Sequence, residues 1–391
     1  MSACYACGMT QGHATLIAGL PTTNLTLYRE IRFKVGDPTA LMLLPQACGG
    51  VERLLLIRDI EMDRARKHAR VHRVACAAEF EPASGLSGDR ETATAQAVAE
   101  CLRRASIQVV HTDRTLPTIY AHFIQLAGMR VECDVEWGIL ARRAKDEQEL
   151  AWLREAQAAT ERAMQLASRT ILQARAAKDG TLQLDGATLT SDSLRTMIDV
   201  FLLGEGYDNP NSIVACGPQG ADCHDHGSGD LRTEQPIIVD IFPRNKKTLY
   251  NGDMTRTFVH GRIDPLIARM HAAVVAAKRA AIDAVKPGVT GEAVHAATLA
   301  SLAGSGFSSG QPTSSRVPVM SHGTGHGIGL EVHEPPLLAA KAPALIVGDV
   351  LTVEPGLYAL DVGGVRVEDM VAVTTTGCEN FNRMDEGLHA D

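Results

Sequence analysis

The chain has 391 residues, a formal net charge of −8, 45% hydrophobic residues and 21% charged residues. This ordinary globular composition allows a sizeable core, and the length favours two or three domains. The negative charge and the 4% aromatic content argue against nucleic-acid binding, which needs a basic surface or a base-stacking platform. We therefore expect no nucleic-acid partner.

Nine cysteines are scattered along the chain, and only Cys4 and Cys7 form a CxxC pair. A structural zinc site needs four ligands, and no second pair follows. Reduced thiols are the expected state, with a redox or metal role for Cys4 and Cys7 as the alternative. The N-terminus has no basic start or long apolar run, and no stretch approaches the roughly 18 apolar residues of a membrane span. These features predict a soluble, cytoplasmic protein without a membrane partner.

The first 140 residues mix short strand-like and helix-like segments. Leu54–Ile57 and Ile107–His111 are predicted strands, and Ala95–Arg104 is a predicted helix with an apolar side. Alternating strands and helices indicate a small α/β domain over residues 1–140. This region contains no phosphate-binding glycine loop.

From residue 141 onward, the predicted helices come in pairs. A long helix is predicted from about Asp146 to Ala177, because apolar residues recur at helical spacing and acidic residues suit its first turn. The further predicted helices are Thr190–Gly204, Ile267–Val285 and Thr290–Leu302. The predicted strands are Ile237–Phe242, Thr255–His260, Val350–Val353 and Val365–Val373. Two helix pairs beside antiparallel strands indicate an α+β domain over residues 141–391.

Four carboxylates in this second region stand in strands or at strand ends, where charged residues are not expected. Asp240 ends the apolar run IIVD, so it must be paired or bound to a metal, because an isolated buried charge is too costly. Asp253 opens DMTRTF, Glu354 follows VLTV, and Glu368 lies within VRVEDMVAV. A polar hairpin loop over 243–252 is expected to place Asp240 and Asp253 on neighbouring, paired strands.

Strand geometry also predicts partners for these carboxylates. Thr255 and Thr257 share a strand face with Asp253, so their hydroxyls are expected to support that carboxylate. Arg366 and Glu368 point the same way, so Arg366 is expected to brace Glu368 or a neighbouring carboxylate.

Histidines gather in two glycine-containing segments. His322 and His326 lie in SHGTGHGIGL, whose glycines disfavour a helix and let a metal approach closely. This run lacks the Lys-Ser/Thr pair of a phosphate-binding loop. His333 follows it, and His224 lies upstream in CHDHGSG. Taken singly, each histidine or carboxylate is more often a structural polar residue. The ordered set Asp, Asp, His, Glu, Glu instead fits metal-assisted hydrolysis, which needs such ligands to converge on one pocket.

Five motifs in order resemble the superfamily of methionine aminopeptidase, Xaa-Pro aminopeptidase, prolidase and creatinase, which has the pita-bread fold. They are IIVD at 237–240, DMTRTF at 253–258, HGTGHGIGLEVHEPP at 322–336, LTVEPGLY at 351–358 and GVRVEDMVAVT at 364–374. The run ARRAKDEQELAWLREA at 141–156 resembles the helix that opens the catalytic domain in the Xaa-Pro branch. The resemblance implies a pita-bread catalytic domain over 141–391 and a creatinase-like N-terminal α/β domain over 1–140.

The resemblance also implies the site residues. Two divalent metal ions are expected on Asp240, Asp253, His326, Glu354 and Glu368. Oxygen-rich ligation with one histidine favours manganese or cobalt, with iron or zinc as alternatives. The implied catalytic residues are His224, His322, His333 and Glu354, and the three histidines and Arg366 are also expected to contact substrate.

The implied activity is that of an Xaa-Pro aminopeptidase or dipeptidase, which hydrolyses the bond before proline in small peptides, in a protein expected to be a homodimer. A creatinase-like hydrolase of a small non-peptide C–N substrate and a non-catalytic binding module are the alternatives. Three departures from the family pattern concern the substrate. Asp240-Ile241-Phe242 replaces the usual Asp-x-Gly, the loop to Asp253 is longer than usual, and the segment between Glu354 and Glu368 is short.

Overall fold

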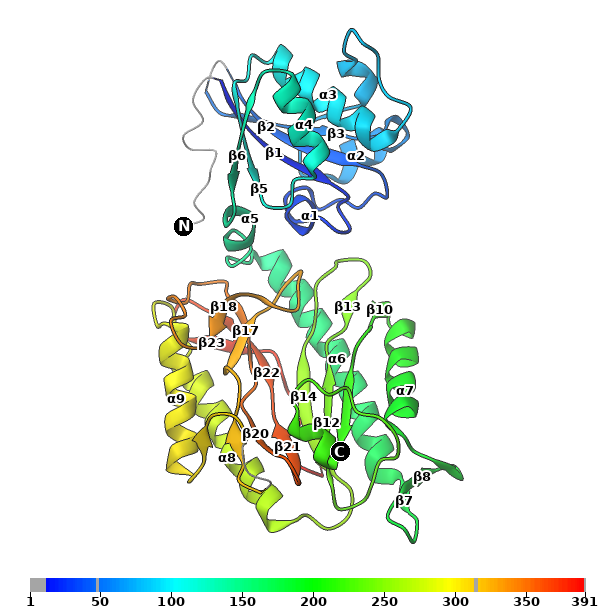
Figure 1. Ribbon diagram of the computed structural model, residues 1–391, viewed down its shortest axis with the longest axis vertical. Coiled ribbons are helices and arrows are strands. Elements are labelled where there is room, and N and C mark those ends of the chain that lie inside the picture. Colours follow the sequence, from blue (N-terminus) through cyan, green and yellow to red (C-terminus); the bar gives the residue numbers. More distant parts are fainter. Residues whose placement is uncertain (1–11, 47–48, 313–315, 390–391) are drawn as a thin grey trace. The chain divides into compact units, whose positions relative to one another are not determined.

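The computed structural model describes residues 12–46, 49–312 and 316–389, and the chain separates into two compact units, Met1–Arg142 and Arg143–Asp391 (Figure 1). Cys4 and Cys7, whose thiols are predicted to be reduced, lie outside the described residues. Within the described ranges, none of the helices combines the length and apolar character needed to cross a membrane.

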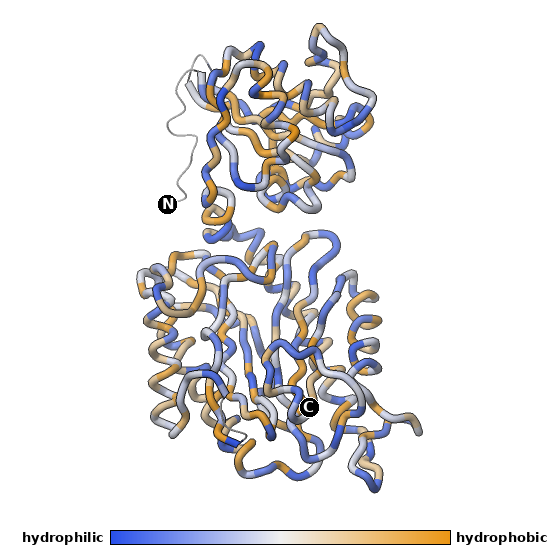
Figure 2. The backbone as a smooth tube through the Cα atoms, in the orientation of Figure 1, coloured by the Kyte–Doolittle hydropathy of each residue, from blue (hydrophilic) through white to orange (hydrophobic). Residues whose placement is uncertain are grey.

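A six-stranded mixed sheet forms the centre of the first unit, in the order β4-β3-β2-β1-β5-β6. Its strands are β1 (His13–Gly19), β2 (Thr39–Pro45), β3 (Val51–Leu56), β4 (Arg73–Ala75), β5 (Val109–Asp113) and β6 (Arg130–Asp134). Hydrophobic residues recur along these strands, so both faces of the sheet carry a core (Figure 2). Leu16 faces one core and its neighbour Ile17 faces the other, as strand alternation requires.

Helices cover both faces of this sheet, which confirms the predicted α/β domain. The helices are α1 (Leu25–Ile31), η2 (Asp59–Glu61), α2 (Met62–His68), η3 (Ala77–Phe80), α3 (Arg90–Arg104), α4 (Thr118–Leu126) and α5 (Trp137–Leu140). Residues of α1 and α2 pack in the core on one face, and residues of α3 and α4 pack in the core on the other.

The first half of the second unit is a three-stranded antiparallel sheet with two helices. The sheet has the order β11-β12-β14, and its strands are β11 (Ile213–Cys216), β12 (Pro236–Ile241) and β14 (Met254–Val259). The helices α6 (Glu147–Gln173) and α7 (Ser191–Gly204) share one core with it. Smaller elements beside it are β7 (Arg175–Ala176), β8 (Leu182–Leu184), β9 (Ala187–Thr188), β10 (Tyr207–Asp208), η4 (Gly217–Ala221) and β13 (Arg244–Asn245).

The second half has two further sheets, which pack with α8 (Pro265–Ala284) and α9 (Gly291–Gly304). The four-stranded sheet has the order β15-β16-β20-β21, with β15 (Ser308–Ser309), β16 (Val319–Met320), β20 (Gly356–Ala359) and β21 (Gly363–Arg366). The five-stranded sheet has the order β18-β17-β19-β22-β23, with β17 (Gly325–Gly327), β18 (Glu334–Leu338), β19 (Val350–Val353), β22 (Asp369–Val373) and β23 (Cys378–Asn380). In Figure 1, α8 and α9 lie at the left of the second unit and α7 lies at its right, and α6 runs behind β12 and β14.

Capping side chains set where the long helices begin. Asp146 accepts a hydrogen bond from the backbone of Glu149, whose side chain accepts one from the backbone of Asp146. Such a reciprocal box satisfies two backbone donors that a helix start leaves unpaired. Thr190 and Thr290 cap α7 and α9 through their hydroxyls. Side-chain capping therefore anchors the helices that support the strands.

The pairing of β12 with β14 brings the first two carboxylates together. In this antiparallel pair Asp240 lies opposite Thr255, and Ile241 lies opposite Met254. Asp253 immediately precedes β14, so it lies beside the end of β12, as the sequence predicts.

The 243–252 segment connects the antiparallel neighbours β12 and β14, as expected for a hairpin, but it also holds buried residues, Tyr250 and Asn251, and a strand, β13, that pairs with β10. One prediction about the strands is wrong. The predicted strand Val365–Val373 is two strands in different sheets, because the chain leaves β21 after Arg366 and enters β22 at Asp369.

Candidate metal centre

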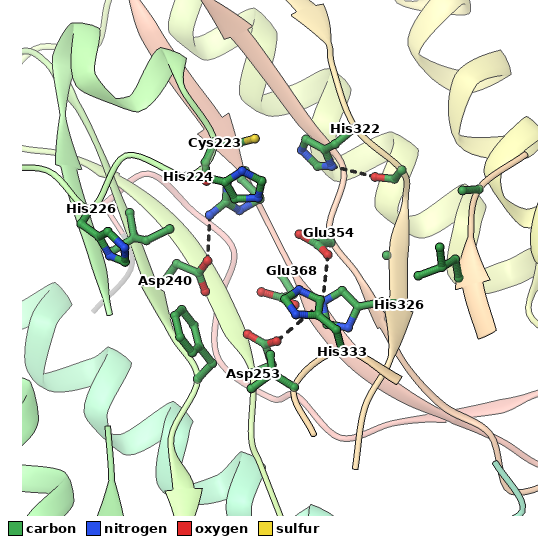
Figure 3. Close-up of a pocket in the computed structure, with 18 residues that line it drawn as sticks. Cys223, His224, His226, Asp240, Asp253, His322, His326, His333, Glu354 and Glu368 are labelled. Carbon is green, nitrogen blue, oxygen red and sulfur yellow. Dashed lines mark hydrogen bonds and ion pairs between the residues drawn. The ribbon is translucent and has the colours of Figure 1, made fainter. Parts of the chain in front are cut away.

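A cavity of about 350 Å³ in the second unit is lined by all the predicted metal ligands, catalytic residues and substrate-binding residues (Figure 3). Its lining includes His224, Asp240, Asp253, His322, His326, His333, Glu354, Arg366 and Glu368. The labelled side chains in Figure 3 come from separate strands and loops and meet in this one cavity. The motifs are far apart in the sequence, so this convergence is a property of the fold.

Carboxylates from both halves of the unit meet on one side of the cavity. Asp240 lies in β12, Asp253 precedes β14, and Glu368 lies in the connection between β21 and β22. Each of the three offers an oxygen atom, and these atoms lie within 4.8 Å of one another. Glu354 follows β19 and lines the same cavity.

These carboxylates have little positive charge to compensate them. Burial raises the pKa of Asp253 and Glu368 well above the ordinary range, and repulsion from neighbouring carboxylates raises it further. Burial also raises the pKa of Glu354. A protein that gathers acidic groups out of water without enough cationic partners favours either protonation or a bound cation.

The orientation of the His326 ring fits a bound cation. His326 Nδ1 lies 3.1 Å from the carbonyl oxygen of Gly327, which can only accept, so Nδ1 carries the hydrogen. Burial lowers the pKa of His326, which favours the neutral ring. The lone pair on Nε2 then faces the carboxylates, at 3.3 Å from Glu354 Oε1 and 3.9 Å from Asp253 Oδ2. A cation can bind between the Nε2 lone pair and these carboxylate oxygens. Metal-binding histidines commonly donate their other ring N–H to an acceptor, as His326 Nδ1 does to the Gly327 carbonyl.

The two carboxylate oxygens of Asp240 also fit a bound cation. Its Oδ2 accepts a hydrogen bond from Arg366 Nη2 at 2.8 Å. Its Oδ1 is buried, and no group among the described residues donates to it. A buried carboxylate oxygen without a donor is costly unless a cation binds it. The residues present therefore fit divalent metal ions.

Arg366 also orders the histidine on the far side of Glu354. Its Nη1 donates to Tyr358 Oη at 3.1 Å, and Tyr358 Oη lies 2.7 Å from His322 Nε2. His322 Nδ1 lies 2.7 Å from the Gly323 carbonyl and must donate to it, so the Tyr358 hydroxyl donates to Nε2. This chain fixes the tautomer of His322, and burial lowers its pKa.

An ion pair supports the loop that carries the remaining downstream histidine. The His333 ring lies 4.2 Å from the ring of His326, measured between centroids. The next residue, Glu334, is buried and accepts from Lys145 Nζ at 3.0 Å and from two backbone N–H groups of the loop. We infer that this pair holds the His333 loop against the cavity.

Several residues that contact the predicted ligands or line the cavity have roles that the sequence did not predict. Thr255 donates to Glu368 Oε2 at 2.9 Å, and Thr257 bonds to the backbone of Arg366, so the prediction that both serve Asp253 is wrong. Gln157 on α6 instead holds the backbone of Asp253 through its N–H and its carbonyl. Tyr358 lies within the LTVEPGLY motif, and this motif is the feature of the sequence from which its place at the site could have been predicted. Phe242 and Cys223 also line the cavity.

The chain is similar to known proteins both in sequence and in fold. A model of metallopeptidase family M24 matches residues 151–375. The probable dipeptidase PepE of Mycobacterium tuberculosis is 38% identical over 179 residues, 45% of this chain and 45% of that protein. The Xaa-Pro dipeptidase of Pyrococcus horikoshii is 29% identical over 194 residues, 49% of this chain and 52% of that protein. The structure of an X-Pro aminopeptidase from Thermotoga maritima covers 96% of both chains at 22% identity, with a TM-score of 0.77.

These comparisons differ in what they show. The matched segment spans about half the length of the curated relatives. The likeness to the solved structure extends over nearly the whole chain and, at its low identity, shows the fold. The predicted pita-bread domain with an N-terminal α/β domain is therefore confirmed.

Proposed function

The chain belongs to metallopeptidase family M24, and from this premise we propose that it is a two-metal peptidase that hydrolyses the bond before proline in small peptides. The observation that carries the proposal is the His326 lone pair directed at Glu354 and Asp253. The dipeptidase and aminopeptidase names of its relatives support a peptide substrate and proline specificity. The predicted homodimer and cytoplasmic location stay predictions.

The ligand set that we propose draws on both halves of the unit. Asp240, Asp253, His326, Glu354 and Glu368 would hold two divalent ions, and manganese or cobalt suits these mainly oxygen donors. When bound, such ions polarise a carbonyl and make water more acidic. Arg366 orients Asp240, and Thr255 orients Glu368.

The remaining roles belong to groups at the edge of the cavity. Glu354 accepts the proton of the attacking water at a carboxylate oxygen and passes it to the leaving amine. His333 donates a hydrogen bond to the oxyanion that forms at the scissile carbonyl. His224 holds the amide nitrogen, and His322 contacts the substrate from the Tyr358 side. Phe242 gives the cavity an apolar wall at the place where the family pattern has glycine.

The test combines metal uptake with a peptide panel. Protein freed of metal is supplied with Mn²⁺, Co²⁺, Fe²⁺ or Zn²⁺, and the bound metal is measured before Ala-Pro, Ala-Pro-Ala, Ala-Ala and Ala-Ala-Ala are offered. Cleavage of Ala-Pro alone identifies a dipeptidase, and cleavage of Ala-Pro-Ala identifies an aminopeptidase. Hydrolysis of creatine without peptide hydrolysis favours the creatinase-like alternative. A protein that takes up none of these ions, or that cleaves neither Ala-Pro nor Ala-Pro-Ala, contradicts the proposal.

A matched pair of variants separates the site from the fold. Glu354→Gln removes the charge of a proposed ligand and is expected to abolish detectable hydrolysis. Glu205→Gln makes the same change on the surface, where Glu205 pairs with Arg162, and is expected to leave hydrolysis unchanged. Equal activity in the two variants would exclude the proposed role of Glu354.

A further inference from the structure

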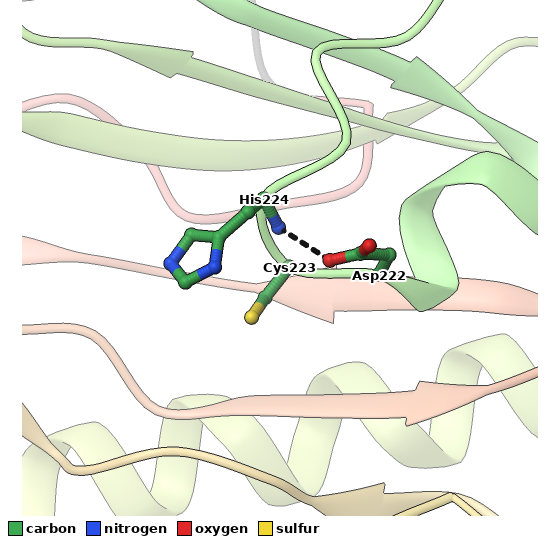
Figure 4. Close-up of side chains that lie close together, drawn as sticks. All are labelled: Asp222, Cys223 and His224. Atoms are coloured by element: carbon green, nitrogen blue, oxygen red, sulfur yellow. Dashed lines mark hydrogen bonds between the residues drawn. The ribbon is translucent and has the colours of Figure 1, made fainter.

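Three consecutive residues after η4 form a second cluster of metal-binding groups. Asp222, Cys223 and His224 each offer one donor atom, and the three atoms lie within 4.8 Å of one another (Figure 4). In a tetrahedral zinc site, bonds of about 2.0–2.3 Å place the donors about 3.3–3.8 Å apart. Small side-chain rotations would therefore bring the three donors to coordination distance.

The donor types differ from those of the carboxylate cluster. A thiol, an imidazole and one carboxylate suit borderline cations such as Zn²⁺ and Co²⁺, whereas an oxygen-only group suits harder ions. Within the described ranges, this cluster and the group of Asp240, Asp253 and Glu368 are the two sets of three such residues. Their different chemistry makes it possible to load and detect them separately.

The backbone holds these donors in place without a metal. The N–H of Asp222 donates to the carbonyl of Gln219 at 3.2 Å, and the N–H of Asp225 donates to the carbonyl of Asp222 at 3.2 Å. The N–H of His224 donates to Asp222 Oδ1 at 2.9 Å, which leaves the second carboxylate oxygen for a ligand (Figure 4). The loop is thus positioned before any ion binds.

The cluster also lies where it can affect the proposed reaction. Cys223 and His224 line the cavity, and both Asp222 and His224 are exposed. Arg366 Nη1 donates to the carbonyl of Cys223 at 3.3 Å, and its Nη2 donates to Asp240. One arginine therefore ties the backbone of this cluster to a proposed ligand of the catalytic metals.

We propose that Asp222, Cys223 and His224 form a third metal site, selective for Zn²⁺ and Co²⁺, whose occupation inhibits the enzyme. The Cys223 thiol releases its proton to solvent as the sulfur–metal bond forms. Metal binding takes the imidazole lone pair of His224 and removes this side chain from the substrate. The inhibitory consequence rests on the proposed function, whereas the metal site itself does not.

Cobalt spectroscopy tests the site directly. Co²⁺ is titrated into the full chain carrying Cys4→Ser and Cys7→Ser, so that this pair adds no thiolate signal. Thiolate-to-cobalt charge-transfer absorption in the near ultraviolet is expected to reach the intensity of one thiolate-bound cobalt per chain, by the time that three equivalents of Co²⁺ have been added. Because the carboxylate cluster contains no sulfur, cobalt bound there adds nothing to this band. Thermal unfolding of each protein reports that it is folded.

Single substitutions in the protein that carries Cys4→Ser and Cys7→Ser test which residues bind the cobalt. Cys223→Ser is expected to abolish the band, and Asp222→Asn is expected to weaken cobalt binding about tenfold. Cys133→Ser changes an exposed thiol of the first unit and is expected to leave the band intact. Absence of the band in the background protein, or its persistence in Cys223→Ser, overturns the site.

A hydrolysis assay tests the inhibition. Zinc in excess of two equivalents is expected to inhibit the manganese-loaded enzyme, and Asp222→Asn is expected to raise the required zinc concentration about tenfold. Equal inhibition of both proteins would overturn the regulatory role while leaving the cobalt result intact. If no protein hydrolyses any peptide, the proposed function fails, and the charge-transfer band still decides the metal site.

Discussion

Two neighbouring carboxylates, Glu368 and Asp369, lie in opposite electrostatic surroundings. Both are buried. The pKa of Glu368 is raised well above its ordinary range by burial and by nearby carboxylates. Burial also acts to raise the pKa of Asp369, but Lys278 and Arg256 outweigh it and lower the pKa. Adjacent residues in the chain therefore differ: the pKa of one carboxyl is raised, and two buried cations lower the pKa of the other.

The source of this difference is the side of the strands on which each group lies. Asp369 accepts from Arg256 Nη2 at 2.9 Å and from Lys278 Nζ at 2.5 Å, both fully buried side chains. Glu368 faces the cavity, and among the described residues the hydroxyl of Thr255 is the hydrogen-bond donor to its carboxylate. The fold therefore pairs the structural carboxylate of Asp369 with buried cations. It leaves the carboxylate of Glu368, at the proposed metal site, without a comparable cationic partner in the part of the chain that the structure describes.

The largest expected effect is on stability, in the variant Lys278→Met. Lys278 Nζ contacts Asp369 and, at 2.6 Å, Glu386 Oε1. Loss of the ammonium leaves a buried carboxylate with less compensation, which is expected to lower the free energy of unfolding by about 3–5 kcal/mol. Urea unfolding followed by Trp152 fluorescence in a Trp137→Phe background reports on the second unit.

The matched control replaces a cation on the surface. Arg262 pairs with Glu234, and its side chain is 78% exposed. Arg262→Met is expected to change the free energy of unfolding by less than about 1 kcal/mol. If Lys278→Met has an equally small effect, the buried network does not stabilise the fold as described.

Glu368→Gln is expected to reduce activity by at least about 100-fold, or about 2.7 kcal/mol of transition-state stabilisation, because it removes a proposed metal ligand. The same change is expected to stabilise the metal-free protein, because it removes repulsion among buried carboxylates. Hydrolysis with added Mn²⁺ and urea unfolding with a chelator measure the two effects.

Asp369→Asn provides the contrast on the neighbouring residue. Because it leaves two buried cations short of a partner, it is expected to destabilise the protein with or without metal. If both variants shift the stability of the metal-free protein in the same direction, the division between the two carboxylates is wrong.

An intermediate effect is expected from Arg366→Lys. A lysine cannot reproduce the bonds that Arg366 makes to Asp240, Tyr358 and Thr255 at once. Loss of such a supporting group commonly costs about 10–100-fold in metal affinity or activity. Manganese titration measures the affinity, and an unchanged dissociation constant would show that Asp240 needs no such support. Tyr358→Phe, which removes one of the three bonds, is expected to show a smaller loss.

Local signals in the sequence predicted much of the fold. The capping residues Asp146, Thr190 and Thr290 begin the helices as expected, and β19 has the predicted bounds Val350–Val353. These features depend on a few adjacent residues, so a sequence pattern captures them. The proposed ligands also converge as expected, because their motifs are specific to a family.

What the sequence missed depends on contacts between distant segments. The division of 365–373 into two strands follows from which sheet each part joins, and the residues VRVEDMVAV carry no sign of it. Lys278 looks like any other residue of the predicted helix, although the fold buries it completely against Asp369. The role of Tyr358 arises only where Arg366 and His322 meet it.

The smallest expected effect comes from the solvent-facing side of a helix in the first unit, where charge pairs contact water. On α3, Glu100 accepts from Arg103 at 2.7 and 2.8 Å and from Arg104 at 2.7 Å. Hydrogen bonds from Arg103 and then Arg104 lower the pKa of Glu100 to about 2. Because the folded pKa lies below the unfolded value of about 4.3, the stabilisation is complete above that value and is lost as the pH falls towards 2.

The two arginines are about half exposed, so solvent screening limits this contribution to about 0.5 kcal/mol. Glu100→Gln is therefore expected to lower the free energy of unfolding of the first unit by about this amount at pH 7, and by nothing near pH 2. Urea unfolding followed by Trp137 fluorescence in a Trp152→Phe background measures it. High salt is expected to reduce the difference between Glu100→Gln and the unsubstituted chain, whereas it should leave the Lys278→Met effect almost unchanged, because buried pairs are screened much less. Equal salt sensitivity of the two effects would mean that burial does not set these charge networks apart.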